Sequence, residues 1–490
     1  MTEGLTLAVD VPSLPKNWTR TKVGDIYEVV SGGTPSRDVE SYWTGDIPWI
    51  SSADIYGPKD IRPRRSISEQ AIQRSATHLV PEGSLIVVTR VGLGKVGIAP
   101  TRLCFSQDSQ ALIGDEKHIC PLFSLYYLSQ AVQVFKQQSR GTTIAGVPKK
   151  QLAELTFALP PVNEQHRIVA EIEKQFSRLD VGIAALKRAQ ANLRRYRASV
   201  LKAACEGRLV PQDPSDEPAS ELLKRLALLH QGGRASQPRT NNILAKETSN
   251  DLGREGEPLR ELPAGWSWSR IGQVAECLDY RRVPINKKER ALRIGSVPYY
   301  GANGPVGWID DYIFDEPLVL VVEDETFTGR EKPFSYKVAG KSWVNNHAHV
   351  LRATATIDTD FLNISLAYYP FTPLTTGSTG RRKLTQAALM SAPYALPPLA
   401  EQHRIVAEVD RRVSVVEELE AVVAANLKRA ERLRQAILKR AFEGRLVPQD
   451  PDDEPASVLL EKIRAERNEA ERGNKRKAMQ LRLPTGETTT

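Results

Sequence analysis

The sequence predicts an α+β protein in which two strand-rich domains are joined by two long helices. These helices are expected to pair as an antiparallel coiled coil with pseudo-twofold symmetry. Three observations predict this fold. Residues 159–220 and 396–457 are near copies of each other. Each copy carries apolar residues at heptad spacing, which is typical of helices that pair. The segment before each copy is rich in β-branched runs, glycine and proline, which indicate strands and turns.

The size and composition of the chain fit two or three folded domains. It has 490 residues, of which 41% are hydrophobic and 26% charged. The N-terminus lacks the pattern of a secretory signal, and no apolar run approaches the roughly 20 residues of a membrane helix. We therefore expect a cytoplasmic protein without a membrane segment. The four cysteines form no Cys-x-x-Cys pair, so they are expected to be reduced thiols rather than zinc ligands or disulfides.

The two strand-rich domains are expected at residues 1–158 and 259–395. Each contains a buried-strand run, Ser84-Leu-Ile-Val-Val in the first and Leu318-Val-Leu-Val-Val in the second. Both open alike, with Leu14-Pro-Lys-Asn-Trp18 and Leu262-Pro-Ala-Gly-Trp266, but their interiors hardly align. Similar helical regions that follow two domains of dissimilar sequence indicate two recognition modules for two different targets.

The repeated regions are expected at residues 159–230 and 396–463. Leu159–Ser220 aligns with Leu396–Ser457 at a constant offset of 237 residues, without a gap and with 32 identities in 62 positions. The longest identical blocks are Glu-Gln-His-Arg-Ile-Val-Ala-Glu and Glu-Gly-Arg-Leu-Val-Pro-Gln-Asp-Pro. Chance cannot produce this match, so the chain contains an internal duplication.

Each repeated region should begin with a long helix that has one apolar stripe. The proline pairs at 160–161 and 397–398 mark its start, and Gly207 and Gly444 mark its end. About 45 residues at 1.5 Å each give a rod of roughly 65 Å. The stripe is expected at Ile172, Leu179, Leu186, Leu193 and Val200 in the first copy, with Ile168, Phe176, Ile183 and Tyr196 between them, and at Val409, Val416, Val423, Ala430 and Ile437 in the second.

A narrow apolar stripe must be buried, and the other copy is the nearest partner. Antiparallel pairing is the simplest arrangement, because it gives the duplication a pseudo-twofold axis. The alternative is that each stripe packs on its own globular domain. Residues 231–258 lack apolar periodicity and are expected to be a flexible linker, and residues 464–490 a charged, disordered tail.

Motifs of nucleotide binding and catalysis are weak in this sequence. Gly92-Leu-Gly-Lys-Val-Gly97 matches Gly-x-Gly-x-x-Gly, but Ile98-Ala-Pro100 follows where a helix should begin, so a glycine-rich turn is expected instead. The sequence has no Walker motif, no Glu-x-Lys tripeptide of nucleases, and no Asn/Asp-Pro-Pro-aromatic motif of amino-methyltransferases. We therefore expect a non-catalytic protein that binds no cofactor and no metal.

Four histidines could suggest chemistry. His347 and His349 could bind a metal, but they lack a cysteine or acidic partner at helical spacing, so a hydrogen-bonding role is favoured. His166 and His403 lie in the first turn of the long helices beside glutamates. Capping and packing between domain and helix are favoured there over acid–base catalysis.

Several features suit contact with DNA. The net charge is +8 with a pI of about 9.1, which suits a polyanionic partner. Basic and polar residues gather in the loops of both strand-rich segments, where amides and guanidinium groups can read base edges and lysines can hold phosphates. The candidate DNA-binding residues are Gly33, Thr34, Arg37, Arg64, Arg90, Lys95, Ser109, Gln110 and Thr142 in the first domain, and Arg281, Tyr300, Asn303, Arg330, Asn345, Asn346, His347, Arg381 and Arg382 in the second.

The order of these parts resembles the specificity subunit of bacterial type I restriction-modification systems. The repeated Leu-Pro-Pro-x-x-Glu-Gln-x-x-Ile-Val and Glu-Gly-Arg-Leu-Val-Pro-Gln motifs carry the resemblance, which covers about residues 14–463. The strand-rich segments match in style, as in Gly32-Gly-Thr-Pro-Ser, Gly45-Asp-Ile-Pro-Trp49 and Tyr300-Gly-Ala-Asn-Gly304.

The resemblance implies a non-catalytic subunit whose two target-recognition domains each read one half of a bipartite, asymmetric site on double-stranded DNA. The paired helices would set the spacer and dock two modification subunits. The modification subunits would use S-adenosylmethionine, and restriction subunits would use ATP and Mg. A related type IIB-like system is the nearest alternative. An enzyme with an unrecognised site and a coiled-coil adaptor without a DNA role are the other two.

Overall fold

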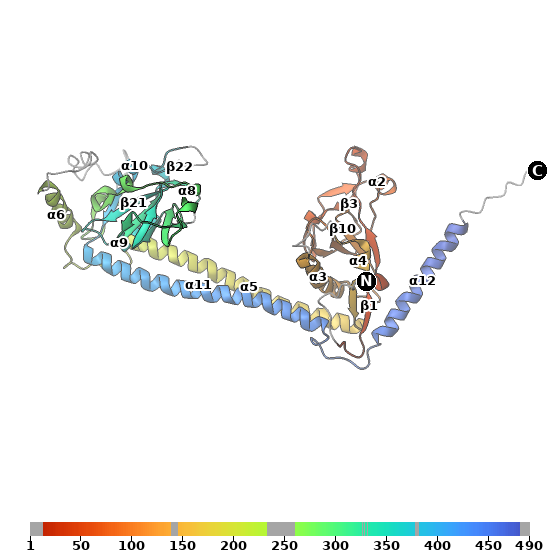
Figure 1. Cartoon of the computed structure of the whole chain (residues 1–490). Helices are drawn as coiled ribbons and strands as arrows, with labels where there is room; N and C mark the ends of the chain where they lie inside the picture. The colour runs from red at the N-terminus through yellow and green to blue at the C-terminus, as the bar shows by residue number, and fades with distance from the viewer. Residues whose placement is uncertain are drawn as a thin grey trace, which may run out of the picture. The chain divides into compact units, whose positions relative to one another are not determined.

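The computed structural model describes residues 13–138, 146–232, 260–325, 327, 329–330, 332–377 and 382–480 (Figure 1). The chain divides into two compact units, residues 1–186 with 425–490, and residues 187–424. Each unit contains one strand-rich domain and one half of each long helix. We call residues 13–159 domain 1 and residues 260–396 domain 2. Most of the expected linker, residues 233–258, lies outside the described residues.

Domain 1 is built around an antiparallel sheet of four strands in the order β2-β10-β7-β8. Its central strand β7 is the expected apolar run, and all four of its residues are buried. A second sheet, β6-β3-β9, contains a parallel pair, and β1 pairs with β11 where the chain enters and leaves the domain. The strands are β1 Thr19–Lys22, β2 Glu28–Ser31, β3 Ile47–Ile50, β4 Ile55–Gly57, β5 Asp60–Ile61, β6 Arg65–Ile67, β7 Leu85–Val88, β8 Val96–Ile98, β9 Cys104–Phe105, β10 Ser109–Ile113 and β11 Thr156–Leu159.

Short helices and one longer helix complete domain 1. The longer one, α3, carries Phe123 and Tyr127 into an aromatic cluster with Phe157. This cluster is the centre of the main core of the first unit. The helices are α1 Val23–Ile26, α2 Glu69–Arg74, α3 Pro121–Gln138 and α4 Lys149–Ala153, with 3₁₀ turns at Glu40–Tyr42 and Ser52–Asp54.

Domain 2 repeats this plan. Its central sheet has the order β13-β21-β17-β19, a second sheet has the order β15-β14-β20-β16, and β12 pairs with β23. The strands are β12 Ser267–Arg270, β13 Ala275–Cys277, β14 Val297–Gly301, β15 Gly304–Ile309, β16 Phe314–Asp315, β17 Leu318–Val322, β18 Asp324–Glu325, β19 Ser335–Val338, β20 Lys341–Val344, β21 Ala348–Ala353, β22 Arg382–Lys383 and β23 Pro393–Leu396; the helices are α7 Ile271–Val274, α8 Lys287–Leu292, α9 Thr359–Ala367 and α10 Gln386–Ser391, with 3₁₀ turns at Asp279–Arg281 and Thr372–Leu374.

The two domains have one topology, although their interiors hardly align in sequence. The central strand β7 corresponds to β17, and both are flanked by equivalent neighbours. The parallel pair β3–β9 corresponds to β14–β20. The expectation of two strand-rich domains with dissimilar sequences is therefore confirmed, and the structure adds that they share one topology. Different apolar side chains can fill the same pattern of inward-facing positions, so the fold persists when the sequence does not.

Two helices of 44 residues each, α5 (Val162–Cys205) and α11 (Leu399–Phe442), form the repeated rods. Each starts directly after a proline pair and stops before a glycine with positive φ, 69° at Gly207 and 67° at Gly444. At both ends the amide of the residue after the glycine donates to a carbonyl five residues earlier, Arg208 to Ala203 and Arg445 to Arg440. This is the Schellman arrangement, which requires a left-handed residue and so favours glycine.

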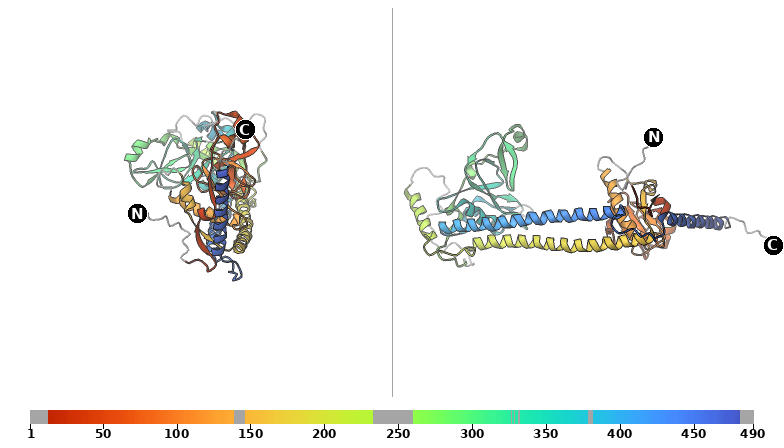
Figure 2. Two further views of the ribbon diagram at one scale, coloured as in Figure 1. Left: turned by 90° about the vertical axis from the view of Figure 1, so that its right-hand side faces the viewer. Right: turned by 90° about the horizontal axis from the view of Figure 1, so that it is seen from below.

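The helices α5 and α11 run antiparallel within each unit, as expected (Figures 1 and 2). In the first unit Arg434 near the end of α11 meets Asp180 in the first half of α5. In the second unit Arg197 in the second half of α5 meets Glu417 in the first half of α11. The expected stripe of α11 is buried along its whole length, whereas Leu179, Leu186 and Leu193 of α5 are half-buried.

The seam also differs from the expectation in two respects. Tyr196 is 45% exposed, because the seam position four residues after Leu193 belongs to Arg197. The ends of the stripe pack on the domains as well as on the other helix: Ile168 and Ile172 belong to the core that contains domain 1. The two alternatives for burying the stripe therefore both occur, one in the middle and one at the ends.

A further helix follows each rod, α6 at Ala219–Gly232 and α12 at Ala456–Gln480. The expectation of a disordered tail from residue 464 is wrong for residues 464–480. Leu459, Leu460 and Ile463 anchor α12 in the core of the first unit. Arg464 then pairs with Asp25 at 3.4 Å, and good helix formers continue the helix beyond this anchor.

Two expectations from composition can be compared with the described residues. All four cysteines are free thiols, Cys104 and Cys120 buried and Cys205 and Cys277 half-buried. Burial raises the pKa of the Cys104 thiol to about 11, so it stays protonated at neutral pH. Among the described helices, none is long and apolar enough to cross a membrane.

Candidate nucleic-acid interface

The loops that carry most of the candidate residues meet at one edge of the central sheet in each domain. In domain 1, strands β2 and β7 end and β10 begins at this edge, because β10 runs antiparallel to both. In domain 2 the same edge is formed by the ends of β13 and β17 and the start of β21. We call these edges the loop edges. Each brings together segments that lie far apart in the sequence.

The loop after β7 forms one part of the loop edge of domain 1. The amides of Thr89 and Arg90 donate to the carbonyl of Asp108, which joins this loop to the one before β10. Arg90 is exposed. Gly92 and Gly94 have positive φ, and strand β8 follows at Val96, so this glycine-rich segment is a turn between strands, as expected, and not a nucleotide-binding loop.

Lys95, at the end of this turn, is held by the protein. Its ammonium donates to the carbonyls of Ser52 and Ile55, each at 2.9 Å. Lys95 therefore ties the turn to the 3₁₀ turn at Ser52–Asp54 and the start of β4, although its residue as a whole remains exposed.

Gly33, Thr34 and Arg37 follow β2 at the same edge. Gly33 is buried. Its carbonyl accepts a hydrogen bond from the indole of Trp49 at 3.1 Å, and a β-carbon at this position would collide with the backbone of Ala76. Thr34 contacts the side chain of Gln107, and Arg37 is exposed. Of the three, Arg37 and Thr34 present side chains at the surface, and Gly33 is needed for close packing.

Ser109 and Gln110 are the two candidates that the structure places inside. Their exposed fractions are 2% and 7%, and the amide of Gln110 donates to the carbonyl of Val147 at 3.0 Å. Buried side chains on a central strand cannot reach base edges, so we no longer propose these two as DNA contacts. The exposed residue of this loop is Gln107, which belongs to the same polar run, Gln107-Asp-Ser-Gln110, as the two buried candidates.

Arg64 lies outside the loop edge, just before β6. It forms an ion pair with Asp54, whose side chain is only 5% exposed. Burial alone would raise the pKa of Asp54, but hydrogen bonds from Ser51 and Arg64 hold it below its usual range.

The candidates of domain 2 converge more closely. The amide oxygen of Asn303 accepts from Arg330 at 2.7 Å, and the Arg330 guanidinium lies over the ring of Phe334. Asn303 comes from the turn between β14 and β15, and Arg330 from the segment between β18 and β19. Two candidates from different segments therefore share one surface.

The loop before β21 contributes three further candidates. The side chain of Asn345 is buried and accepts from the amide of His347, which shapes the turn. Asn346 and His347 are exposed, and the ring of His347 lies 2.6 Å from a carboxylate oxygen of Asp324. Asn346 and His347 are therefore the surface residues of this loop, and Asn345 supports them.

Three more candidates of domain 2 are held by structural contacts. Arg281 donates to the carbonyl of Ile313 at 2.8 Å and lies over the ring of Phe314. Arg382 donates to the hydroxyl and carbonyl of Thr375. Tyr300 is half-buried against Tyr336. The remaining candidates, Thr142 and Arg381, lie outside the described residues.

Sequence reasoning missed a charged cluster beneath the loop edge of domain 2. Glu323, 8% exposed as a side chain, pairs with Arg282 at 2.5 Å and with Lys383 at 2.9 Å. Burial alone would raise the pKa of Glu323, but these two cations hold it below its usual range. The basic pairs at 281–282 and 382–383 were the available signal, yet nothing in the sequence shows which member of each pair turns inward.

His349 joins this cluster through hydrogen bonds. Its Nδ1 lies 2.5 Å from the Asp279 carboxylate and its Nε2 lies 2.9 Å from the carbonyl of Leu384. Cys277, Asp279 and His349 form a group that could hold a metal ion. Both ring nitrogens already face protein oxygens, however, so the geometry agrees with the favoured hydrogen-bonding role.

The start of each long helix is fastened to its domain by the Glu-Gln pair of the repeat. Glu164 accepts from the indole of Trp18 at 2.9 Å and from Gln449 at 2.5 Å. Its repeat equivalent Glu401 accepts from Trp266 and from Gln212, each at 3.1 Å. Burial raises the pKa of both carboxyl groups above the usual value.

Each of these junctions also binds the end of the other rod. Gln449 and Gln212 belong to the loops after α11 and α5, and Arg167 pairs with Asp453 at 2.6 Å as Arg404 pairs with Asp216 at 2.5 Å. His166 and His403 are exposed. The Glu and Gln that precede them make most of the contacts to the domains, and His403 adds one, since its Nε2 lies 3.8 Å from a carboxylate oxygen of Asp358.

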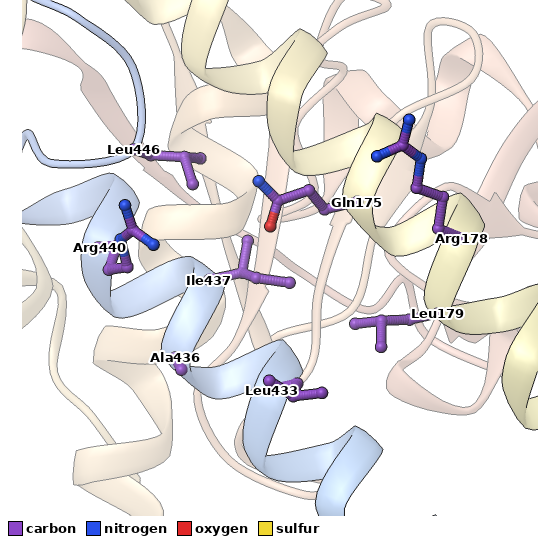
Figure 3. Close-up of a pocket in the computed structure, with 8 residues that line it drawn as sticks. All are labelled: Gln175, Arg178, Leu179, Leu433, Ala436, Ile437, Arg440 and Leu446. Carbon is purple, nitrogen blue, oxygen red and sulfur yellow. The ribbon is translucent and has the colours of Figure 1, made fainter.

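An open hollow of about 370 Å³ lies between α5 and α11 in the first unit (Figure 3). Leu179 of α5 and Leu433 and Ile437 of α11 form its apolar floor, with Arg178 and Arg440 at its rim. The repeat equivalents of Leu433 and Arg178 in the second unit are Tyr196 and Val415, which are 45% and 48% exposed. Both units therefore present apolar side chains on the outside of the rods.

A family model described as the type I restriction modification DNA specificity domain matches residues 15–189 and 263–424, more than half of the chain. The chain belongs to this family. Each match covers one strand-rich domain and part of the helix that follows it, so this specificity subunit carries the domain twice.

Curated relatives extend over nearly the whole chain. The EcoDI specificity subunit of Escherichia coli is 24% identical over 471 residues, which are 93% of this chain and 96% of that protein. The StySPI specificity subunit of Salmonella potsdam is 24% identical over 480 residues with the same two coverages. A solved chain from a study of assembly and conformational transition of the type I R-M system has a TM-score of 0.59 at 20% identity and covers 89% of this chain and all of that one, which shows the same fold.

The family assignment explains why catalytic motifs are missing from the sequence. A type I specificity subunit recognises DNA sequence and is not the catalytic subunit. The loop edges of the two domains carry different residues.

Proposed function

We propose that the two domains each read one half of a bipartite, asymmetric site on double-stranded DNA. One observation carries this proposal: the chain holds two copies of one fold, on duplicated helices, with different residues at equivalent loop edges. Domain 1 offers Thr34, Arg37 and Arg90 there, and domain 2 offers Arg330, Asn346 and His347. Guanidinium, amide and imidazole groups can pair with base edges, and different sets select different bases.

The exchange of one domain tests this assignment. Replacing residues 1–158 by those of a relative with another target should change one half of the recognised sequence and leave the other half intact. Mapping of methylated adenines in cells that carry the parent or the chimera gives both halves and the spacer. A change in both halves would show that the domains are not independent readers.

We further propose that the paired helices set the spacer between the half-sites. The junctions at Glu164 and Glu401 fasten both ends of each rod to the domains, so the number of residues between junctions determines the separation. One added heptad in each helix lengthens an antiparallel pair by about 10 Å, or about three base pairs at 3.4 Å each.

A matched insertion tests the spacer. Seven residues added to α5 after Leu186 and seven added to α11 after Ala424 should lengthen the spacer by about three base pairs. The control is the same insertion in α5 alone, which breaks the match between the seams. An unchanged spacer in the doubly extended protein would exclude the helices as the determinant.

The duplicated surface of the rods suits two copies of one partner, which we propose are the two modification subunits. Identical partners need equivalent sites, and the exposed apolar residues Leu433 and Tyr196 are repeat-related; Val415, at the place of Arg178, adds a second exposed apolar side chain in the second unit. The modification subunits would contribute S-adenosylmethionine, and restriction subunits would contribute the ATP- and Mg-dependent step, in a cytoplasmic complex.

The assignment of catalysis to partner subunits, and of DNA recognition to this chain, can be tested separately. The purified chain alone should neither methylate nor cleave DNA, and the complex with modification subunits should methylate it. Catalysis by the chain alone would contradict the assignment. Absence of salt-dependent DNA binding by the complex would favour a coiled-coil adaptor.

A further inference from the structure

The residues Gln110 and His349 occupy equivalent positions in the two domains. Each is the second residue of its strand, β10 or β21. Each lies opposite the penultimate residue of the central strand, Val87 for Gln110 and Val321 for His349. Both side chains are buried, with exposed fractions of 7% and 1%.

The two side chains make the same hydrogen bond. Gln110 donates from Nε2 to the carbonyl of Val147 at 3.0 Å, and Nε2 of His349 lies 2.9 Å from the carbonyl of Leu384. Val147 and Leu384 are themselves equivalent, because each lies two residues before the short helix α4 or α10. A carbonyl can only accept, so Nε2 of His349 carries the proton.

The acceptor residues tie a second segment to the same point. The amide of Val147 donates to the carbonyl of Thr89, and the amide of Leu384 donates to the carbonyl of Glu323, both at 2.8 Å. Thr89 and Glu323 are the first residues after the central strands β7 and β17. One buried side chain in each domain therefore joins three segments at the loop edge.

The residues next to these anchors are those proposed to face DNA. Arg90 follows Thr89 directly, and His347 contacts Asp324, which follows Glu323. A shift of the anchored backbone would move all of these side chains together.

We propose that Gln110 and His349 are equivalent positioning residues, each of which holds the loops of one domain in the geometry that reads its half-site. The inference rests on the proposed function of the two domains. It gives a physical role to Gln110, which lies too deep to touch a base, and to His349, whose two ring nitrogens both face protein oxygens.

The two domains donate to this equivalent carbonyl from different kinds of side chain, an amide in domain 1 and an imidazole in domain 2. In domain 2 the second ring nitrogen of His349 faces Asp279, which also accepts from the amide of Val350 at 2.9 Å. In domain 1 the residue at the place of Asp279 is Ser31, opposite Gln110 across β2 and β10. A neutral amide paired with a short neutral side chain should therefore replace the His349–Asp279 pair without leaving a buried charge.

The test uses two matched variants of the full-length chain in complex with its modification subunits. Both carry Asp279→Asn; one adds His349→Gln, which keeps a donor for Leu384, and the other adds His349→Leu, which fills similar volume without a donor. The probe is a random-sequence duplex DNA library, from which bound molecules are selected and sequenced. The discrimination at each half-site is read separately.

The Gln variant should select both half-sites like the parent chain. The Leu variant should lose about tenfold or more of its discrimination in one half-site and keep the other, since a misplaced base contact costs about this much. Gln110→Leu, the corresponding change in domain 1, should affect the opposite half-site.

The outcomes separate the inference from the proposed function. Equal discrimination by the Gln and Leu variants, or equal losses in both half-sites, would overturn the positioning role. A parent chain that selects no bipartite sequence would instead refute the proposed function. Thermal unfolding of each variant identifies one that fails to fold, and Gln110→Leu then supplies the independent measurement.

Discussion

At the scale of single residues, the buried Glu164 and Glu401 explain why the repeat keeps a Glu-Gln pair. A carboxyl group with 1% or less of its surface exposed needs donors, and each of these two has an indole and a glutamine amide. Loss of a donor leaves a buried acceptor unsatisfied, which costs more than the hydrogen bond contributes on balance.

Trp266→Phe removes the indole donor to Glu401 and keeps most of the apolar volume. We expect the free energy of unfolding to fall by about 1–3 kcal/mol, measured by urea denaturation. Trp308→Phe is the control, because Trp308 is 60% exposed and its replacement should have little effect. Equal effects of the two changes would show that the hydrogen bond to Glu401 is unimportant.

The same carboxyl groups predict a pH dependence. Burial raises the pKa of Glu164 above its usual 4.5 in the folded state, so folding favours the protonated form. The stability from this group is fully present below pH 4.5 and is lost as pH rises through the folded pKa. Glu164→Gln cannot titrate.

We therefore expect the Gln variant to lose less stability than the parent chain as the pH increases above 4.5. The measurement is the free energy of unfolding of both proteins across this range. The ion pair of Asp453 contributes the opposite trend to both proteins, so their difference isolates Glu164. Parallel curves would contradict the prediction.

At the scale of elements, the glycine inside α5 and the glycine that follows it should respond to mutation in opposite directions. Gly207 ends the helix with a φ of 69°, and a β-carbon there would lie 2.5 Å from Pro263 and 2.9 Å from Trp266. Gly182 lies inside the helix, where a β-carbon would meet nothing within 4 Å.

Gly207→Ala should destabilise the chain by at least about 1–2 kcal/mol from backbone strain alone. Gly182→Ala should stabilise it by about 0.5–1 kcal/mol, because alanine is the better helix former. Thermal unfolding of the two variants measures both. Shifts of the same sign would show that the cap geometry at Gly207 does not matter.

At the scale of the whole molecule, the proposed docking of two modification subunits depends on the outer surface of the rods. Leu433 in the first unit and Val415 in the second are 44% and 48% exposed on the rods. Glutamate at either place would put a charge into an apolar contact, which is costly unless it is paired.

The double variant Leu433→Glu with Val415→Glu should fold normally and bind modification subunits at least about tenfold more weakly, because one lost apolar side chain contributes about 1.5 kcal/mol or more. Copurification and titration by light scattering measure this. Val181→Glu is the control, since Val181 is 67% exposed and its repeat equivalent is already Glu418. Unchanged binding by the double variant would place the docking surface elsewhere.

The sequence by itself determined the duplication, the two long helices and their ends. Heptad spacing, proline pairs and glycines are local signals. Proline and glycine determine where a helix starts and ends, and the heptad spacing determines which face of it is apolar. The sequence also placed most candidate residues in loops, since glycine, proline and polar residues are typical of loops. It failed at Tyr196, where the register differs by one residue, and at residues 464–480, where tertiary anchoring supports a charged helix.

Only the tertiary structure decided which residues of those loops face outward and which hold them. Gln107 and Gln110 lie three residues apart, yet one is exposed and the other is 7% exposed beneath the loop edge. The common topology of the two domains could not be predicted from the sequence either. Both depend on which strands pair across long sequence separations, and the pattern of one strand does not specify its neighbours.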